Sequence, residues 1–252
     1  MSLRLLSAAD LPDLLALSAS AAWNQMESDW RLLLDLAPQS SFGIELDGRI
    51  VCSTIVLPLS GNVAWIGMVI TLPEYRGRGL ARQLFEKALE QPFVFGLDAS
   101  PMGQPLYEQY GFRPVHGLER WIRQPAPSPY PDPQGAAPLI ATGLLARLAA
   151  QESISLDPDN YACARPGRLA AFFGPCSAAC PETAKRFLAW FLSRHARETC
   201  FWDLEPTHPA ANLALEAGFQ PIRTLVRMYR GDPIPPRDAA VYAYPGFEIG
   251  LV

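Results

Sequence analysis

The sequence has no long apolar run and few of the residues that build disulfides or metal sites. No stretch reaches the ~18–20 apolar residues that a membrane-spanning helix needs. Residues 1–10 lack the basic-then-apolar order of a signal peptide. The five cysteines are odd in number, and neither they nor the three histidines have the spacing of a zinc site. These absences predict a cytoplasmic protein with no membrane partner and no bound metal, whose cysteines are small buried apolar residues.

The chain also lacks a large excess of charge of either sign. The net charge is −4 over 252 residues. Residues 1–124 carry 10 basic and 13 acidic side chains, and residues 125–252 carry 11 and 12. Without a basic face, the chain cannot neutralise a run of phosphates, so we expect no nucleic-acid partner.

The most informative stretch is residues 73–81, Pro-Glu-Tyr-Arg-Gly-Arg-Gly-Leu-Ala. It follows a strand-like apolar run over 63–72 and precedes a helix-like pattern over 80–90. Glycines let a backbone approach a ligand closely, and the start of a helix carries partial positive charge. The pattern predicts a phosphate or pyrophosphate site, with a solvated turn and helix cap as the alternative.

Two familiar phosphate loops do not fit this stretch. A Walker loop needs Gly-Lys-Ser/Thr, which does not follow Gly77. A dinucleotide loop needs a third glycine three residues after Gly79, where Arg82 stands. A dinucleotide-dependent oxidoreductase is therefore disfavoured.

The register of Arg76, Gly79 and Ala81 resembles the Arg/Gln-x-x-Gly-x-Gly/Ala loop of the GNAT superfamily of N-acetyltransferases. A second stretch similar to that family is Leu-Tyr-x-x-x-Gly-Phe over 106–112. The resemblance covers residues 3–123 in element order. It implies an α/β (α+β) fold with a mixed, mostly antiparallel central sheet flanked by helices, and acetyl-CoA as the acyl donor.

The resemblance also assigns site residues. It implies that the end of the strand before the loop binds the pantetheine arm, through Val69, Ile70 and Thr71. It implies that the loop binds the pyrophosphate, through Arg76, Gly77, Arg78, Gly79, Leu80, Ala81 and Arg82. It implies Tyr107 as the general acid near the sulfur, with half-buried helix packing as the alternative. Asp98 is the preferred candidate for the base, ahead of Glu45 and Glu74, although it could instead cap the following turn.

Composition and repetition predict two related domains. Six prolines among residues 124–138 indicate a stiff linker. We expect a catalytic domain over 1–124, the linker over 125–138, and a second GNAT-like domain over 139–252. Both halves place Leu five residues before Gly-Phe, at 106–112 and 213–219.

The second half lacks the chemistry of the first. Residues 174–181 contain no Arg-x-x-Gly-x-Gly, and two prolines there remove N–H donors. Ala214 occupies the position of Tyr107. The end of the chain, including the aromatic tail 242–247, resembles the C-terminal half of a bacterial tandem GNAT group. We expect this half to keep the fold and to have lost cofactor binding.

Hydrophobic periodicity and turn residues predict the elements. Helices are expected over 8–21 (with Ser7 as N-cap), 25–36, 80–90, 104–110, 142–151, 182–194 and 208–217. Strands are expected over 3–6, 42–46, 49–57, 63–72, 93–98, 112–122, 161–165, 168–173 and 200–204, with a hairpin turn at Asp47-Gly48.

The expected activity is direct transfer of an acetyl group from acetyl-CoA to a primary amine of a small metabolite or a peptide. The alternative is a non-catalytic acyl-CoA-binding sensor or scaffold. A homodimer is compatible with the sequence.

Overall fold

The computed structural model describes the chain except residues 60, 132, 134–136, 236–237 and 247–252. Its contacts divide the chain into two compact units. Unit 1 contains Met1–Leu97 and Tyr229–Ile234, and unit 2 contains Asp98–Met228 and Pro235–Val252. Among the helices of the described residues, none combines the length and apolarity needed to cross a membrane.

Unit 1 is built on a mixed sheet in the order β1-β2-β3-β4-β5. Neighbouring strands are antiparallel except β4 and β5, which are parallel. Its elements are β1 (Ser2–Leu5), a 3-10 turn (Ala8–Asp10), α1 (Leu11–Ser20), α2 (Glu27–Leu36), β2 (Ser41–Leu46), β3 (Arg49–Pro58), β4 (Val63–Thr71), a 3-10 turn (Pro73–Tyr75), α3 (Leu80–Ala88) and β5 (Val94–Ala99), whose last two residues belong to unit 2.

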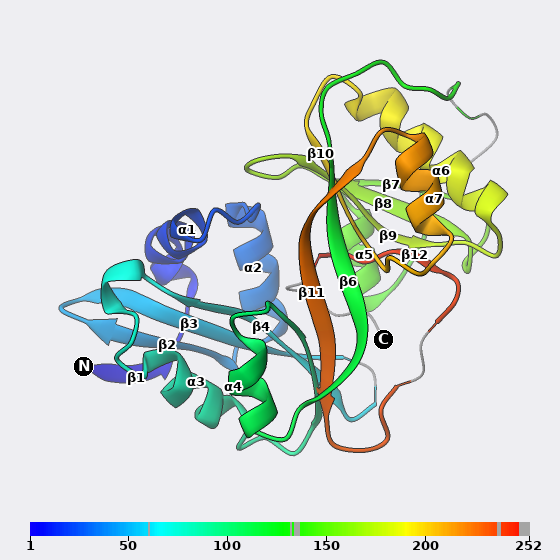
Figure 1. Cartoon of the computed structure of the whole chain (residues 1–252). Helices are drawn as coiled ribbons and strands as arrows, with labels where there is room; N and C mark the ends of the chain where they lie inside the picture. Colours follow the sequence, from blue (N-terminus) through cyan, green and yellow to red (C-terminus); the bar gives the residue numbers. More distant parts are fainter. Residues whose placement is uncertain (60, 132, 134–136, 236–237, 247–252) are drawn as a thin grey trace. The chain divides into compact units, whose positions relative to one another are not determined.

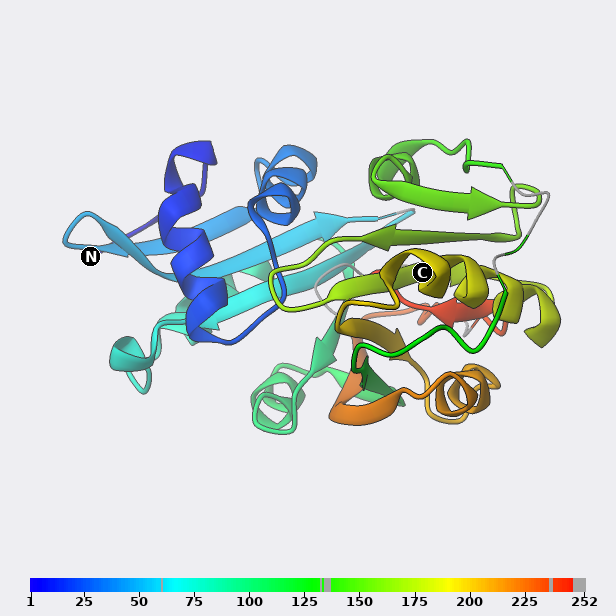
Figure 2. The same ribbon diagram turned by 90° about the horizontal axis from the view of Figure 1, so that it is seen from above.

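Helices cover both faces of this sheet. Helices α1 and α2 lie on one face and α3 lies on the other (Figures 1 and 2). The apolar stripes that predicted these helices supply the core, with Leu14, Trp30 and Phe85 fully buried. The Asp47-Gly48 hairpin is confirmed: both residues have positive φ, 50° and 77°, as a two-residue hairpin turn requires.

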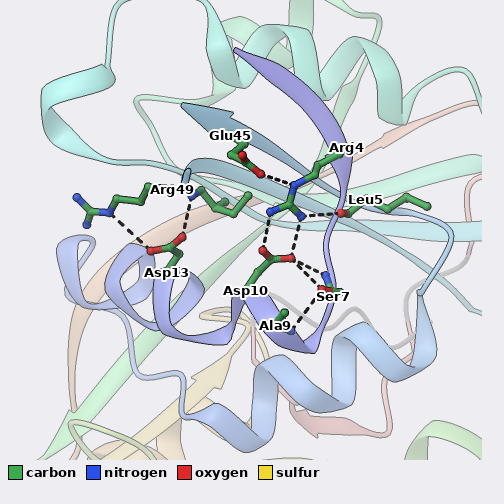
Figure 3. Close-up of polar contacts among 9 residues, drawn as sticks. Arg4, Leu5, Ser7, Ala9, Asp10, Asp13, Glu45 and Arg49 are labelled. Carbon is green, nitrogen blue, oxygen red and sulfur yellow. Dashed lines mark hydrogen bonds and ion pairs between the residues drawn. The ribbon is translucent and has the colours of Figure 1, made fainter. Parts of the chain in front are cut away.

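A polar cluster fixes the entry into the first helix (Figure 3). Ser7 and Asp10 form a capping box, so the predicted N-cap is confirmed, although it caps a 3-10 turn that leads into α1. Arg4 of β1 donates to both oxygens of Asp10, at 2.9 and 2.7 Å, and to Glu45 of β2 at 2.6 Å. The hydrogen bonds from Arg4, more than any other cause, lower the pKa of Asp10.

Unit 2 has the strand order β11-β6-β10-β9-β8-β7, with β12 pairing to β9. Helix α5 lies on one face of β7–β9, and α6 and α7 lie on the other (Figure 2). The elements are α4 (Gln104–Gln109), β6 (Arg113–Arg123), α5 (Gly143–Ala149), β7 (Glu152–Ser155), β8 (Tyr161–Arg165), β9 (Ala171–Ser177), α6 (Pro181–His195), β10 (Cys200–Leu204), α7 (Ala210–Glu216), β11 (Gln220–Arg230, ending in unit 1) and β12 (Val241–Ala243).

Aromatic side chains dominate the core of unit 2. Trp202 packs edge-on against Phe173 and Phe219, with ring centroids 5.1 and 5.6 Å apart. Phe219 is the residue after the glycine that ends α7. The Gly-Phe pair therefore stops a helix and anchors the next strand in the core.

Three sequence predictions differ from the structure. Strand β9 continues to Ser177, beyond its predicted end at 173, because Cys176 and Ser177 pair with Ala162 and Tyr161 of β8. Strand β7 was not predicted, since its four residues carry little pattern. Residues 112–122, expected to form strand within the first domain, correspond to β6 (Arg113–Arg123), which pairs antiparallel with β10 of the second half.

The predicted domain boundaries stay a prediction. Of the expected linker, residues 132 and 134–136 lie outside the described residues, as does Phe247 of the aromatic tail. All five cysteines are free thiols, and four are buried as expected; Cys180 is half-buried.

Candidate acyl-CoA site

The strand before the Gly/Arg loop separates from its parallel neighbour. Pairing between β4 and β5 covers only Val63–Val94, Ala64–Phe95 and Trp65–Gly96. Strand β4 then continues to Thr71 without β5 beside it in that ladder. The two strands therefore splay apart, which frees one edge of the second half of β4.

A β-bulge interrupts β4 within this freed stretch. Ser53 pairs with Ile70 and Ile55 pairs with Gly67, so Met68 and Val69 together oppose Thr54. Met68 has a φ of 54°, which is uncommon for a residue with a side chain. The buried Ser53 hydroxyl donates to the Met68 carbonyl at 2.8 Å and fixes this conformation. A bulge takes a residue out of the ladder and re-aims its backbone groups.

The predicted pantetheine residues lie in the bulge and directly after it. Ile70 is buried, whereas Val69 and Thr71 are half-buried. The Thr71 hydroxyl lies 3.0 Å from the Cys52 sulfur. Arg76 Nε donates to the Thr71 carbonyl at 3.2 Å, which ties the loop to the strand that precedes it.

The loop itself presents a row of backbone donors. Gly77 and Gly79 have φ of 74° and 73°, and the space a Cβ would occupy at each is open to 4 Å. Within the part of the chain that the structure describes, the N–H groups of residues 77–81 donate to no protein acceptor. Helix α3 begins at Leu80, so these N–H groups precede and open its first turn. The arrangement suits an anion with several oxygens.

The arginines of the loop are exposed and differ in what they contact. Arg78 donates to the Glu74 carbonyl at 3.1 Å and stacks 5.0 Å from the centroid of the Tyr75 ring. Arg82 pairs with Glu86 one helical turn later, at 3.1 Å. The residues from Val69 to Arg82 form one continuous stretch within unit 1.

Tyr107 lies on α4, in unit 2, four residues before Gly111. Its ring packs against Phe112 with centroids 6.1 Å apart. Burial raises the pKa of Tyr107 to about 12. At neutral pH the side chain is therefore a phenol, which can donate a proton.

Asp98 also lies in unit 2, at the end of β5. Arg227 of β11 holds it in a two-point ion pair: Nε donates to Oδ1 at 2.9 Å and Nη2 donates to Oδ2 at 3.0 Å. The Asp98 side chain is fully buried. Its role as a base stays a prediction, and it would require an amine to reach an oxygen that Arg227 already occupies.

The other acidic candidates lie elsewhere. Glu45 pairs with Arg4 in the cluster of Figure 3. Glu74 is exposed within the loop, 4.0 Å from Arg49. All of these carboxylates have arginine partners.

The second half has a different loop before its long helix. The N–H of Ala178 donates to the Ala240 carbonyl at 2.9 Å, and that of Ala179 donates to the Asn160 side chain at 2.8 Å. Pro181 begins α6 and has no N–H. Ala214, at the position of Tyr107, is fully buried. Ala178, Ala179 and Pro181, before and at the start of α6, therefore offer no backbone donor to a phosphate.

Sequence reasoning missed Ser53 and Arg227. Ser53 sits inside an ordinary-looking strand, and nothing local marks it. Arg227 had a signal: it stands eight residues after Phe219, as Arg120 stands eight after Phe112.

Comparisons with known proteins agree with this architecture. The model of the "Acetyltransferase (GNAT) family" matches residues 9–112, and that of the "Acetyltransferase (GNAT) domain" matches residues 144–243. No curated protein matches the sequence.

Solved structures share the fold at low sequence identity. A protein from Pyrococcus horikoshii is 17% identical with a TM-score of 0.84, covering 99% of this chain and 95% of its own. A tandem GNAT protein from the clavulanic acid biosynthesis pathway, solved without AcCoA, is 16% identical with a TM-score of 0.64, covering 94% and 99%. A GCN5-related N-acetyltransferase from Sphaerobacter thermophilus is 15% identical with a TM-score of 0.62, covering 91% and 95%.

The splayed strands, the bulge and the donor-rich loop define the GNAT class of acyltransferases. The two matched segments together span most of the chain, and the protein belongs to the GNAT acetyltransferases in their tandem arrangement.

Proposed function

We propose that this chain is an acetyl-CoA-dependent N-acetyltransferase that acetylates a primary amine of a small metabolite or a peptide by direct transfer. The observation that carries the proposal is the row of N–H groups over residues 77–81, which have no acceptor among the described residues and lie at two positive-φ glycines and the start of α3. Family membership supports acetyl transfer in general terms. The acceptor class is our inference.

The residues present fit acetyl-CoA. Open space at Gly77 and Gly79 lets phosphate oxygens approach the backbone. Arg78 and Arg82 are exposed beside them and add positive charge. Residues 69–71, on the freed edge of β4, would bind the pantetheine arm through the backbone. When bound, acetyl-CoA supplies the acetyl group as an activated thioester.

The protein must then satisfy three chemical needs. A backbone N–H at the β4 bulge would stabilise the negative charge that builds on the carbonyl oxygen. Tyr107 would give its phenolic proton to the leaving sulfur; burial raises its pKa to about 12, so the proton is present before reaction. The amine must lose a proton, and Asp98 stays our candidate for that step, subject to its ion pair with Arg227.

The test is release of free thiol from acetyl-CoA in the presence of a panel of primary amines. We expect turnover with at least one amine and a large loss in Gly79→Val, because a β-branched side chain at a φ of 73° distorts the loop. Gly48→Val is the matched control. It has a φ of 77° and equally open surroundings, but lies in the β2–β3 hairpin.

The outcomes separate the two candidate functions. Loss of turnover in Gly79→Val with activity retained in Gly48→Val supports the proposal. CoA binding without thiol release across the panel would overturn catalysis and favour a non-catalytic acyl-CoA sensor. Equal losses of turnover in both variants would show that backbone strain at a positive-φ glycine, and not the position of Gly79 in the loop, explains the effect.

A further inference from the structure

The two halves of the chain carry similar ten-residue segments. Residues 111–120 read Gly-Phe-Arg-Pro-Val-His-Gly-Leu-Glu-Arg, and residues 218–227 read Gly-Phe-Gln-Pro-Ile-Arg-Thr-Leu-Val-Arg. Five of the ten positions are identical: the Gly, Phe, Pro, Leu and Arg. The two opening glycines have nearly the same φ, 82° and 85°. Each segment forms the start of a long strand, β6 or β11, and each ends on an arginine.

A second repeat supplies the partners of these arginines. The short strands β5 and β10 each carry an aspartate at the next-to-last position, and each aspartate begins an Asp-x-x-Pro segment, 98–101 and 203–206. Each aspartate pairs with the arginine of the other half. Arg227 binds Asp98 through 2.9 and 3.0 Å contacts, and Arg120 binds Asp203 through two contacts of 2.7 Å.

The two ion pairs are copies of one another in detail. In both, Nε meets Oδ1 and Nη2 meets Oδ2. Both aspartate side chains are fully buried, and the Arg227 and Arg120 side chains are 4% and 8% exposed. All four residues lie in unit 2. Arg227 also stacks on the Tyr244 ring at 4.3 Å, and Arg120 stacks on Phe201 at 5.3 Å.

The two aspartates lead into different segments. After Asp98, the Ser100 carbonyl and hydroxyl both accept from the Gly103 N–H, at 2.9 and 3.2 Å. The Tyr107 N–H then bonds to the Gly103 carbonyl at 3.3 Å, and the Tyr107 ring lies against Gly103. A short hydrogen-bonded turn thus connects the Asp98 end of β5 to the candidate acid. After Asp203 the corresponding helix carries Ala214 at the position of that acid.

We propose that Arg227, contributed by the second half, is a positioning residue for acetyl transfer. It holds Asp98 at both oxygens, fixes the end of β5, and through the 100–103 turn fixes Tyr107. The Arg120–Asp203 pair, which leads to Ala214 instead of a tyrosine, stabilises the fold alone. This inference rests on the proposed function and extends it by giving the second half a part in the reaction.

The internal copy provides a matched control. The test compares Arg227→Lys and Asp98→Asn with Arg120→Lys and Asp203→Asn in the full-length protein. Three quantities are measured for each variant: kcat and KM for acetyl-CoA, the melting temperature, and hydrogen–deuterium exchange of peptides covering residues 99–107.

We expect the Arg227 and Asp98 variants to lower kcat by about tenfold or more, because small displacements of a catalytic group have large effects on rate. KM for acetyl-CoA should stay within about twofold, since both residues lie outside the stretch that we assign to the cofactor. The double variant Arg227→Lys with Asp98→Asn should lower kcat no further than the more damaging of the two single variants, because each substitution disrupts the same ion pair. Exchange over 99–107 should accelerate. The Arg120 and Asp203 variants should lower the melting temperature while leaving kcat and exchange over 99–107 unchanged.

Several results would overturn the inference. Loss of kcat in Asp98→Asn with full kcat in Arg227→Lys would make Asp98 the base and Arg227 dispensable. Parallel losses in both pairs would reduce Arg227 to a structural role. If Arg227→Lys does not fold, Arg227→Gln combined with Asp98→Asn leaves no buried charge and takes its place. If the wild type shows no turnover, the proposed function fails, and unchanged exchange over 99–107 would still refute the positioning role independently.

Discussion

At the scale of single residues, Tyr107 shows how environment sets chemistry. Its position before Gly-Phe is visible in the sequence, but its protonation is not. Packing against Phe112 and Gly103 removes water from the ring. This burial disfavours the phenolate and raises the pKa of Tyr107 to about 12. The proton is therefore retained through the whole pH range in which an amine acceptor becomes neutral.

Replacing Tyr107 by Phe removes the proton and keeps the ring packing. We expect kcat to fall by ~10²–10⁴-fold, the usual range for a general acid, with KM for acetyl-CoA little changed. Wild-type kcat should not fall between pH 8 and 10 on account of this group, since its pKa of about 12 lies above that range. Rates of thiol release across pH check both statements. An unchanged kcat in Tyr107→Phe would rule out the acid role, and Tyr110→Phe is the control.

At the scale of elements, the bulge in β4 depends on a single hydroxyl. Met68 adopts a φ of 54°, which costs free energy for a residue with a side chain. Ser53 Oγ offsets that cost by donating to the Met68 carbonyl at 2.8 Å. The Thr54 hydroxyl beside it is buried and has no hydrogen-bond partner among the described residues. At the bulge, β4 therefore gives up regular pairing with β3, and its backbone groups take a different orientation.

Ser53→Ala should lower stability by about 1 kcal/mol and also reduce kcat, because the bulge loses the bond that fixes it. Ser40→Ala is the matched control, since the Ser40 hydroxyl also donates to a carbonyl of this sheet, that of Val56, at 2.7 Å. Urea unfolding should give similar losses for the two variants, whereas only Ser53→Ala should change kcat. Similar kcat values in both would show that the Ser53 bond is structural only.

The capping box at the start of the first helix predicts a dependence of stability on pH. Arg4 lowers the pKa of Asp10, so the ionised form stabilises the folded state. This contribution is complete above the pKa of an unfolded aspartate, about 3.9, and is lost as pH falls through the lower folded value. We expect Asp10→Asn to lower the free energy of unfolding by about 1–2 kcal/mol at pH 7.

The difference between wild type and Asp10→Asn should shrink as the pH falls below about 4. Urea unfolding at pH 7, 4 and 2.5 measures it. Asp47→Asn, in the exposed hairpin turn and outside the Arg4 cluster, serves as the control substitution. A difference independent of pH would mean that the loss comes from packing rather than charge.

At the scale of the whole molecule, the two compact units are not two successive halves of the chain. Residues 229–234, near the C-terminus, belong to unit 1. Tyr229 packs edge-on against Trp65 of β4, with centroids 6.2 Å apart, and an added Cβ on Gly96 of β5 would meet its ring at 2.8 Å. The first unit is therefore incomplete without residues from the end of the chain.

Tyr229→Ala should destabilise the protein by ~3–5 kcal/mol, because it removes a large buried ring from beside Trp65. Tyr229→Phe keeps the ring and should cost far less. Chemical unfolding of the two variants, followed by tryptophan fluorescence, makes the comparison. Equal small effects would contradict the dependence of unit 1 on the C-terminal residues.

Much of the fold was predictable because it is local. The Asp47-Gly48 turn, the Ser7 cap and the strand Cys200–Leu204 follow from short patterns, and the structure confirms them. Strand β7 and the extension of β9 through Pro175 were missed because pairing with neighbouring strands, not local propensity, stabilises them. The Gly/Arg loop was predictable because its glycines and the start of α3 are adjacent in sequence.

The sequence by itself determined the Gly/Arg loop, the position of Tyr107, the doubling of the GNAT-like pattern and the loss of the loop in the second half. Only the tertiary structure decided which strand each half pairs with, that Ser53 fixes the bulge, and that Asp98 meets Arg227 at a separation of 129 residues. The physical reason is that caps, turns and phosphate loops use neighbouring residues. Strand partners and buried ion pairs instead join segments that are far apart in the sequence, and only the packing of the folded chain brings them together.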